Sequence, residues 1–143
     1  MRLKQISVFL ENKKGRLQDV CSLLGSNGIN MRALTIAETE SFGVLRMVVD
    51  KSDQAIDLLR KNDFAANVTD VVAVEVEDKP GGLAGILKII SDNDVNIEYM
   101  YGFVEKFSDK ALLVFRFEDT DHAQRILNEN GVSIVAEKDI QGL

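Results

Sequence analysis

The sequence predicts an α+β protein that consists of two copies of one module, each with the element order β-α-β-β-α-β. Three observations predict this fold class: an internal repeat, strands marked by alternating apolar residues, and helices marked by apolar residues three and four positions apart. The segment ENKKGRL at 11–17 can be laid over EDKPGGL at 77–83, a shift of 66 positions. We therefore expect a first module at residues 1–70 and a second module at residues 71–143.

The repeat extends over almost the whole chain. The shift of 66 positions becomes 68 after a hairpin that is two residues longer in the second copy. A register that is kept on both sides of such a gap indicates a true duplication. The matched residues are Ile6, Val8, Leu10, Leu17, Val20, Cys21 and Leu24 with Val72, Val74, Val76, Leu83, Ile86, Leu87 and Ile90, and then Asp53, Ala55, Leu58, Leu59 and Asn62 with Asp121, Ala123, Ile126, Leu127 and Asn130.

The first part of each copy predicts a strand followed by a helix. In the first copy, apolar residues alternate over 6–10, which is the period-2 pattern of a strand with one buried face. Gly15 interrupts this strand, and apolar residues then recur at the spacing of one helical stripe. We expect Gly25 and Gly28 to end this helix.

The remainder of each copy predicts two more strands, a second helix and a fourth strand. The second strand is expected at about 29–37 and the third at 44–49, on either side of a polar turn. Ser52 or Asp53 is the expected N-cap of the second helix. The fourth strand is expected to begin near Ala65 and to run almost without a break into the first strand of the second copy.

This element order predicts the ferredoxin-like plan. Right-handed crossovers between strands place both helices of a copy on one face of an antiparallel sheet. One copy of about 70 residues has only a marginal core by itself. We therefore expect the two copies to pack side by side, with their sheets joined.

Composition and charge indicate a globular protein and argue against nucleic-acid binding. The 143 residues are 45% hydrophobic and 28% charged, and the formal net charge is -6. A nucleic-acid surface needs a basic footprint. RNA-recognition modules share this element order but stack bases on aromatic residues of the central strands. Phe9 is the lone candidate in the first strand, and it matches Glu75 in the repeat. We expect no nucleic-acid partner.

The N-terminal segment and the cysteine count indicate the cytoplasm as the expected location. Residues 1–5 lack the apolar run of a signal peptide, and no segment is long enough to span a bilayer. We therefore expect no membrane partner. Cys21 is the only cysteine, so no intrachain disulfide can form.

Candidate catalytic residues are few. His122 is the only histidine and stands at the start of the predicted fourth helix, where exposure or capping is the expected role. Cys21 lies on the apolar stripe of the first helix and matches Leu87, so we expect a buried, inert thiol. No cluster of cysteines and histidines offers a metal site. We expect no catalysis, no cofactor and no metal ion.

In each copy, a short glycine-containing loop leads from the first strand into the first helix. The N–H groups at a helix start have no partner inside the helix and favour an anion, and a glycine lets a carboxylate approach the backbone. Asn30 and Asn96, which precede the second strands, carry carboxamides suited to both charged groups of an amino acid. The alternative for these glycines and asparagines is a purely structural role in turns. Together the features predict a pocket for a small zwitterion.

The pattern of these segments resembles the ACT domain, a regulatory amino-acid-binding module of several biosynthetic enzymes. The resemblance covers nearly the whole chain. The proline that commonly precedes the family's loop glycine is present only as Pro80, and the loop asparagine is replaced by Asp78 in the second copy. These departures imply two sites that differ in ligand or in affinity. The motif N-x-x-G-x-L followed by G-x-N stands as NKKGRL at 12–17 and GIN at 28–30 in the first copy, and as DKPGGL at 78–83 and DVN at 94–96 in the second.

The resemblance implies a pocket where two modules meet, with the glycine loop of one copy facing the start of the second strand of the other. Tyr99 and Tyr101 are candidates for shaping a side-chain pocket, with ordinary half-buried strand positions as the alternative. The implied ligand-binding residues are Leu10, Glu11, Asn12, Lys14 and Gly15 with Asn96 and Ile97, and Val76, Asp78, Pro80, Gly81 and Gly82 with Asn30 and Met31.

Two functional classes remain open from the sequence. The first is a non-catalytic allosteric sensor, which binds an amino acid and passes that state to a partner, such as a regulated metabolic enzyme, by population shift. The second is a regulatory subunit or interaction module that acts on a partner enzyme without a small ligand. A homodimer is expected in either class, because ACT-like folds commonly dimerise.

Overall fold

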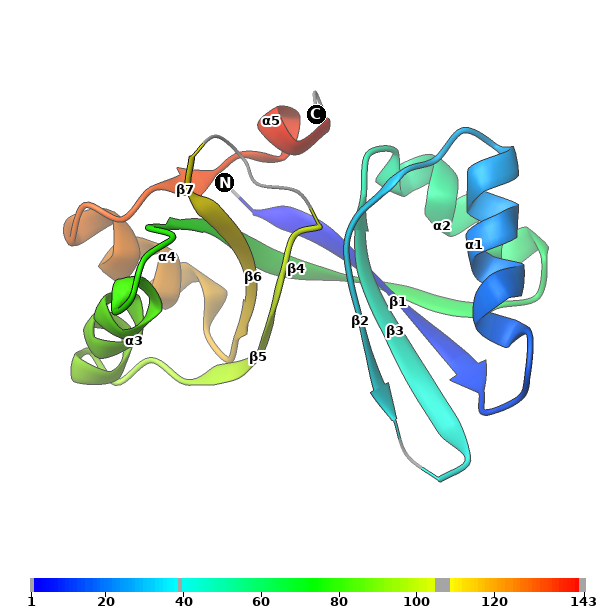
Figure 1. Ribbon diagram of the computed structural model, residues 1–143, viewed down its shortest axis with the longest axis horizontal. Coiled ribbons are helices and arrows are strands. Elements are labelled where there is room, and N and C mark those ends of the chain that lie inside the picture. The colour runs from blue at the N-terminus through cyan, green and yellow to red at the C-terminus, as the bar shows by residue number, and fades with distance from the viewer. Residues whose placement is uncertain (1, 39, 105–108, 142–143) are drawn as a thin grey trace. The chain divides into compact units, whose positions relative to one another are not determined.

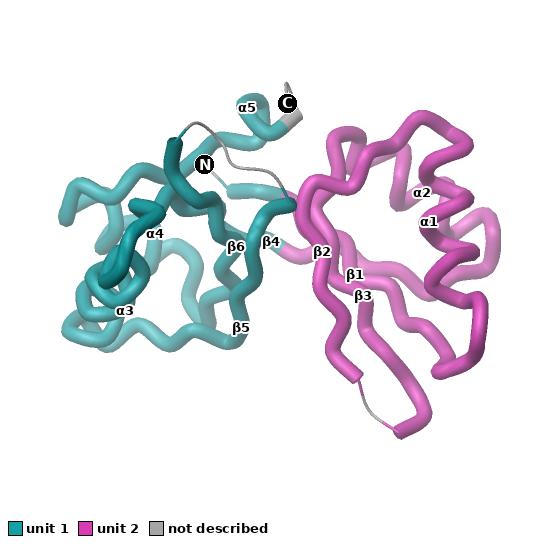
Figure 2. The backbone as a smooth tube through the Cα atoms, in the orientation of Figure 1, with its two compact units in different colours: residues 1–3, 70–140 teal, residues 4–69, 141–143 magenta. Residues whose placement is uncertain are grey.

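The computed structural model describes residues 2–38, 40–104 and 109–141. The chain forms two compact units, which Figure 2 shows in different colours. We call them the first module and the second module. The first module comprises residues 4–69 and 141–143, and the second module comprises residues 1–3 and 70–140.

The first module has a sheet with two helices on one face (Figure 1). Its elements are, in chain order, β1 (Leu3–Glu11), α1 (Arg16–Ser26), β2 (Met31–Glu38), β3 (Phe42–Val49), α2 (Ser52–Lys61) and the beginning of β4 (Ala65–Val76). The strand order is β2-β3-β1-β4. β3 lies between β2 and β1 and pairs antiparallel with both.

The second module repeats this plan and uses the end of β4 as its first strand. Its further elements are α3 (Gly82–Asp92), β5 (Ile97–Gly102), β6 (Ala111–Phe117), α4 (Thr120–Glu129), β7 (Ile134–Val135) and α5 (Glu137–Gln141). β6 pairs antiparallel with β5 and β4, and the short β7 pairs with the other edge of β4. The expected fold class, with two β-α-β-β-α-β modules, is confirmed, and so is the expected run of the fourth strand into the next copy.

Each module buries an apolar core between its sheet and its helices. The alternating residues of the first strand of each copy lie in this core, as the period-2 pattern predicts. Full burial of each such side chain contributes about 1.5–3 kcal/mol. The first core includes Ile6, Val8, Leu10, Val20, Leu24, Leu45, Met47 and Leu59, and the second includes Val72, Val74, Val76, Ile90, Phe115, Phe117 and Leu127.

Backbone hydrogen bonds outside the regular elements recur at matched positions of the two copies. They occur at the glycine loop, at the end of the first helix and at the end of the second helix, so the duplication is visible in atomic detail. The matched N–H to O=C bonds are Asp19 to Gly15 (2.9 Å) and Gly85 to Gly81 (3.0 Å), Ile29 to Leu24 (3.0 Å) and Val95 to Ile90 (3.1 Å), and Phe64 to Leu59 (3.0 Å) and Val132 to Leu127 (3.0 Å).

One helix end differs from the sequence prediction. Gly25 does not end the first helix but lies inside α1, with open space where a Cβ would be. Asn27 is the C-cap, and Gly28 follows with a φ of 72°. Of the two glycines, only Gly28 has the left-handed conformation that ends helices. The presence of a glycine at position 25 was therefore not enough to predict the end of α1.

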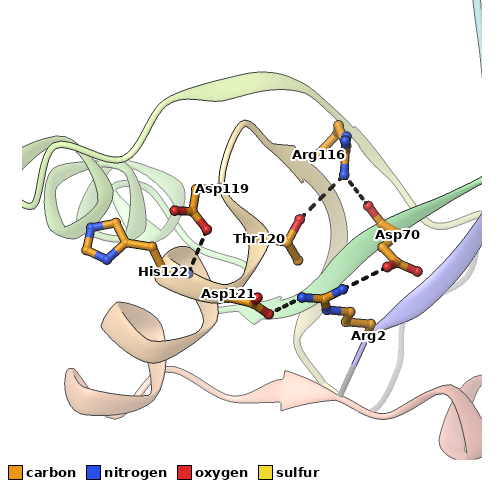
Figure 3. Close-up of polar contacts among 7 residues, drawn as sticks. All are labelled: Arg2, Asp70, Arg116, Asp119, Thr120, Asp121 and His122. Atoms are coloured by element: carbon orange, nitrogen blue, oxygen red, sulfur yellow. Dashed lines mark hydrogen bonds and ion pairs between the residues drawn. The ribbon is translucent and has the colours of Figure 1, made fainter.

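The second helices of the two copies begin differently. Lys51 is the N-cap of α2 and makes no side-chain cap bond, so the prediction of Ser52 or Asp53 was wrong. Ser52 is buried and already helical, and the Lys51 ammonium donates to the Gly28 carbonyl at 3.0 Å instead. In α4 the matched residue Asp119 accepts a hydrogen bond from the His122 backbone N–H at 3.1 Å (Figure 3).

Two arginines hold the start of α4 in the second module (Figure 3). The Arg2 guanidinium forms ion pairs with Asp121 and, at 2.9 Å, with Asp70. Arg116 donates to the Asp70 carbonyl at 2.9 Å and to the Thr120 hydroxyl at 3.4 Å. The start of α4 is therefore fixed by polar contacts as well as by the apolar core.

Candidate ligand-binding site

The two expected glycine loops share one backbone conformation. Gly15 and Gly81 are the N-caps of α1 and α3, with φ of 90° and 85°, in the left-handed region that favours glycine. A Cβ at either position would meet nothing within 4 Å, so the backbone and not the available space requires glycine. Neither cap has a side-chain hydrogen bond. The Arg16 and Gly82 N–H groups donate to the Lys13 and Lys79 carbonyls, and the N–H groups that follow them in the first helical turn present positive partial charge to any anion at the loop.

Each loop also carries an ion pair between residues two positions apart. Glu11 contacts Lys13 at 2.8 Å, and the matched Glu77 contacts Lys79 at 2.7 Å. The hydrogen bond from the lysine, together with its charge, lowers the pKa of the Glu11 and Glu77 carboxyls. Both carboxylates are thus ionised at neutral pH, and each loop offers charges of both signs, as a zwitterion requires.

At the first loop, a small cavity lies against the β2–β3 hairpin. Leu10, Glu11 and Asn12 line this cavity of about 160 Å³, together with hairpin residues that include Phe42. Asn12 is tied to the hairpin, because its carboxamide donates to the Glu40 carbonyl at 3.3 Å and its N–H to Ser41. Lys14 and Gly15 belong to the same loop but not to the lining of this cavity.

At the second loop, a larger cavity of about 430 Å³ lies on another side of the glycines. Pro80, Gly81 and Gly82 line it, while Val76 and Asp78 are adjacent in the chain. The backbone is tightly folded here, since a Cβ on Gly82 would lie 2.1 Å from the Glu77 carbonyl oxygen. The other lining residues are Glu75, Glu77, Lys79, Gly85, Ile86, Ile89, Lys110, Gly131, Val132 and Ser133.

The two expected asparagines close the strand pairing at the start of β2 and β5. The carbonyls of Asn30 and Asn96 each accept a backbone N–H at 3.1 Å, from Asp50 and Glu118 respectively. The Asn96 carboxamide donates to the Glu118 carboxylate at 3.2 Å. Asn96 also lines a cavity of about 490 Å³, with Ile97, and one of about 260 Å³.

Within one module the glycine loop and the asparagine lie at opposite ends. β1 and β2 both run antiparallel to β3, so the end of β1 and the beginning of β2 lie at opposite ends of the strands. The 11-residue helix that connects them spans about 16 Å. No single module brings the two segments together, and the expected pairing of each loop with Asn30-Met31 or Asn96-Ile97 of another module stays a prediction.

Gly82 was among the expected site residues, but other cavity residues of the second module, including Gly85 and Val132, were not predicted from polar and glycine motifs. The signal that could have found them is a loss of side-chain volume between matched residues. Arg16, Asp19 and Phe64 of the first copy match Gly82, Gly85 and Val132 of the second.

The expected roles of the lone histidine and cysteine are partly corrected. Beyond its capped backbone, His122 contacts Arg125 at 2.7 Å and the Asn93 carbonyl at 3.4 Å through its two ring nitrogens. Cys21 is half-buried and not fully buried, because its side chain lies at the margin of the apolar stripe, with Sγ 3.8 Å from the Met31 sulfur. Tyr101 is buried in β5, whereas Tyr99 is half-buried.

In the ranges 2–38, 40–104 and 109–141, no group of three or more His, Cys, Asp or Glu residues is placed to hold a metal ion. In that same part of the chain, no helix combines the length and the hydropathy needed to cross a bilayer.

Comparisons with known proteins agree with this architecture. A family model described as an ACT domain pair matches residues 1–143. A crystal structure from Bacteroides thetaiotaomicron is 41% identical with a TM-score of 0.93, covering 100% of this chain and 98% of that one. The regulatory subunits of aspartate kinase from Thermus thermophilus and Thermus flavus are 17% and 16% identical, with TM-scores of 0.62 and 0.60. Each comparison covers 88% of this chain and 90% of the subunit, and shows a shared fold. No curated protein matches the chain.

Proposed function

The chain belongs to the family of ACT domain pairs, and we propose that it binds a free amino acid at a glycine loop and passes the ligand state to a partner protein. The family resembles regulatory rather than catalytic domains. We propose both that the chain is an amino-acid sensor and that it catalyses no reaction.

The observation that carries the proposal is the repeated geometry of the glycine loops. In both modules a left-handed glycine begins a helix directly after an ion pair, beside a cavity. The helix start and the lysines that line the two cavities suit a carboxylate, and the glutamates that line them suit an ammonium group. An α-amino acid carries these two groups on one carbon, so it fits the loop without any further cofactor.

The output of such a sensor requires a partner. A ligand that binds one of two conformations better shifts the population toward it, and the shift is limited by the difference in affinity. The Thermus thermophilus relative is a regulatory subunit of aspartate kinase and was crystallised in a ligand free form. By analogy of fold, we propose that a regulated metabolic enzyme is the partner of this chain, and that the chain itself forms a homodimer.

The proposal is tested by thermal unfolding of the purified chain against each of the twenty amino acids at millimolar concentration. A ligand at about 100 Kd raises the free energy of unfolding by roughly 2.7 kcal/mol, and one amino acid or a chemically related group is expected to raise the midpoint. If no amino acid does so, ligand sensing is wrong and regulation by protein association alone takes its place.

A further inference from the structure

The cavity at the second glycine loop is a pocket within one module. Its walls come from the loop, from the exposed side of α3 and from the turn between α4 and β7, all of which belong to the second module. Its volume of about 430 Å³ lies in the range of about 300–1,000 Å³ that is usual for small-molecule sites.

The first module shows what closes the equivalent corner. There Phe64 is 9% exposed and belongs to the core, and the Arg16 guanidinium lies over its ring, 4.7 Å from the centroid. The matched residues in the second module are Val132 and Gly82. The backbone is held alike in both, because Phe64 and Val132 donate to matched carbonyls at 3.0 Å. The second module therefore lacks the side chains that fill this corner, while the backbone hydrogen bond of the turn is kept.

The third lost side chain widens the pocket along the helix. Asp19 of α1 matches Gly85 of α3, and a Cβ on Gly85 would meet nothing within 4 Å. A glycine inside a helix costs about 1 kcal/mol relative to alanine, and no turn or close contact requires one at this position. The gap leaves Ile86 and Ile89 as an apolar wall of the cavity.

Four charged residues line the cavity, and two of them form an ion pair with each other. Glu77 and Lys79 are engaged with each other at 2.7 Å. For Glu75 and Lys110, no side-chain hydrogen bond or ion pair is found among the residues that the structure describes. The charge of Lys110 contributes to the lowered pKa of Glu77, which places the lysine near the loop. One carboxylate and one ammonium in a pocket that also has an apolar wall match the two charges of a zwitterion.

We propose that the pocket between α3 and the α4–β7 turn binds an aliphatic α-amino acid of the size of valine, leucine or isoleucine. Its side chain lies against Ile86, Ile89 and Val132, its carboxylate faces Lys110 and its ammonium faces Glu75. This inference rests on the proposed function and adds to it the ligand class and the module that holds the ligand. It places this pocket in the second module.

The test compares wild-type protein with two variants that fill the pocket, Gly85→Leu and Val132→Phe. Binding of L-valine, L-leucine and L-isoleucine is measured by calorimetry and by the shifts of isoleucine methyl NMR signals, with glycine and L-aspartate as polar controls. We expect the aliphatic ligands to bind the wild type and to shift the methyls of Ile86 and Ile89. Each filling variant is expected to raise the Kd at least tenfold.

The matched control is Gly25→Leu, a glycine-to-leucine change inside α1 at a position with open space around the added Cβ. It brings the same gain in helix propensity and is expected to leave the Kd unchanged. Folding of the variants is verified by their unfolding midpoints without ligand, which Gly85→Leu is expected to raise. Two filling variants that bind like the wild type overturn this inference alone, whereas a wild type that binds no amino acid overturns the proposed function with it.

Discussion

The two glycine loops share a left-handed glycine cap but have different surroundings. In the first module, Arg16 lies over the ring of Phe64, and the corner between the first helix and the last turn is filled. In the second module, Gly82 and Val132 stand at these positions beside a cavity of about 430 Å³. The comparison shows that matched hydrogen bonds preserve the fold of a duplicated module while the side-chain volume at one corner changes. Because each module has its own core, one copy can open a pocket while the other stays filled.

The largest loss of stability is expected from a substitution at Gly82 of the second module, where there is no space for a side chain. In Gly82→Ala the new Cβ would lie 2.1 Å from the Glu77 carbonyl oxygen, and a backbone atom has to move. We expect a loss of about 3 kcal/mol in the free energy of unfolding, the upper part of the usual range for overpacking. Urea unfolding measures it.

The control for this variant is Gly85→Ala in the same helix, where the added Cβ has open space. It is expected to stabilise by about 1 kcal/mol. If Gly82→Ala were as stable as Gly85→Ala, the tight contact between the loop and the helix start would not exist in solution.

A smaller loss in the free energy of unfolding is expected when Phe64 of the first module is replaced by valine, the matched residue of the second module. Phe64→Val removes most of a buried ring and is expected to cost about 2 kcal/mol, less than the 3–5 kcal/mol typical of Phe→Ala. A double-mutant cycle with Arg16→Ala is expected to show a coupling of about 0.5–1 kcal/mol, from the lost cation–π contact. Urea unfolding of the four proteins gives both values, and a coupling of zero would contradict the stacking seen in the structure.

The sequence predicted the architecture because the patterns that determine it are local and occur twice. Alternating apolar residues in β1 and the end of β4 face the two cores, and the helical stripes appear at the expected spacing. Cap positions were harder to predict, since the burial of Ser52 moves the cap of α2 to Lys51. A polar residue near a helix start indicates the boundary only to within about one residue.

The candidate site was less predictable than the fold. Polar motifs led to the glycine loops, where the structure has left-handed caps and cavities. The pocket in the second module depends on missing volume at Gly82, Gly85 and Val132, and the charged residues that line it form no sequence motif. A motif search reads the residues that are present, whereas a cavity follows from three-dimensional packing and from what the matched copy has in its place.

The smallest effect on stability is expected from the Glu11–Lys13 and Glu77–Lys79 ion pairs, which occupy matched positions in the two loops. The hydrogen bond from Lys79 is the largest cause of the lowered pKa of Glu77, and Lys13 acts in the same way on Glu11. Since a lowered carboxyl pKa favours the folded state above the ordinary glutamate value of about 4.3, the contribution is complete above that pH. It is lost as the pH falls through the lowered pKa of the folded protein.

Lys79→Met is therefore expected to raise the pKa of Glu77 in a carboxyl NMR titration and to leave the pKa of Glu11 unchanged. The rise should bring the pKa of Glu77 back to at least its ordinary range, because the desolvation that raises this pKa outweighs the Lys110 charge that still lowers it; desolvation and Arg16 act in the same order on Glu11. The reciprocal variant Lys13→Met serves as the control, and added salt should shrink both shifts since the pairs are exposed. A Glu77 pKa that does not respond to Lys79→Met would mean that the pair is absent in solution. Both charges of that pair would then be available to a ligand, and the zwitterion would have to be placed against Glu77 and Lys79 in place of Glu75 and Lys110.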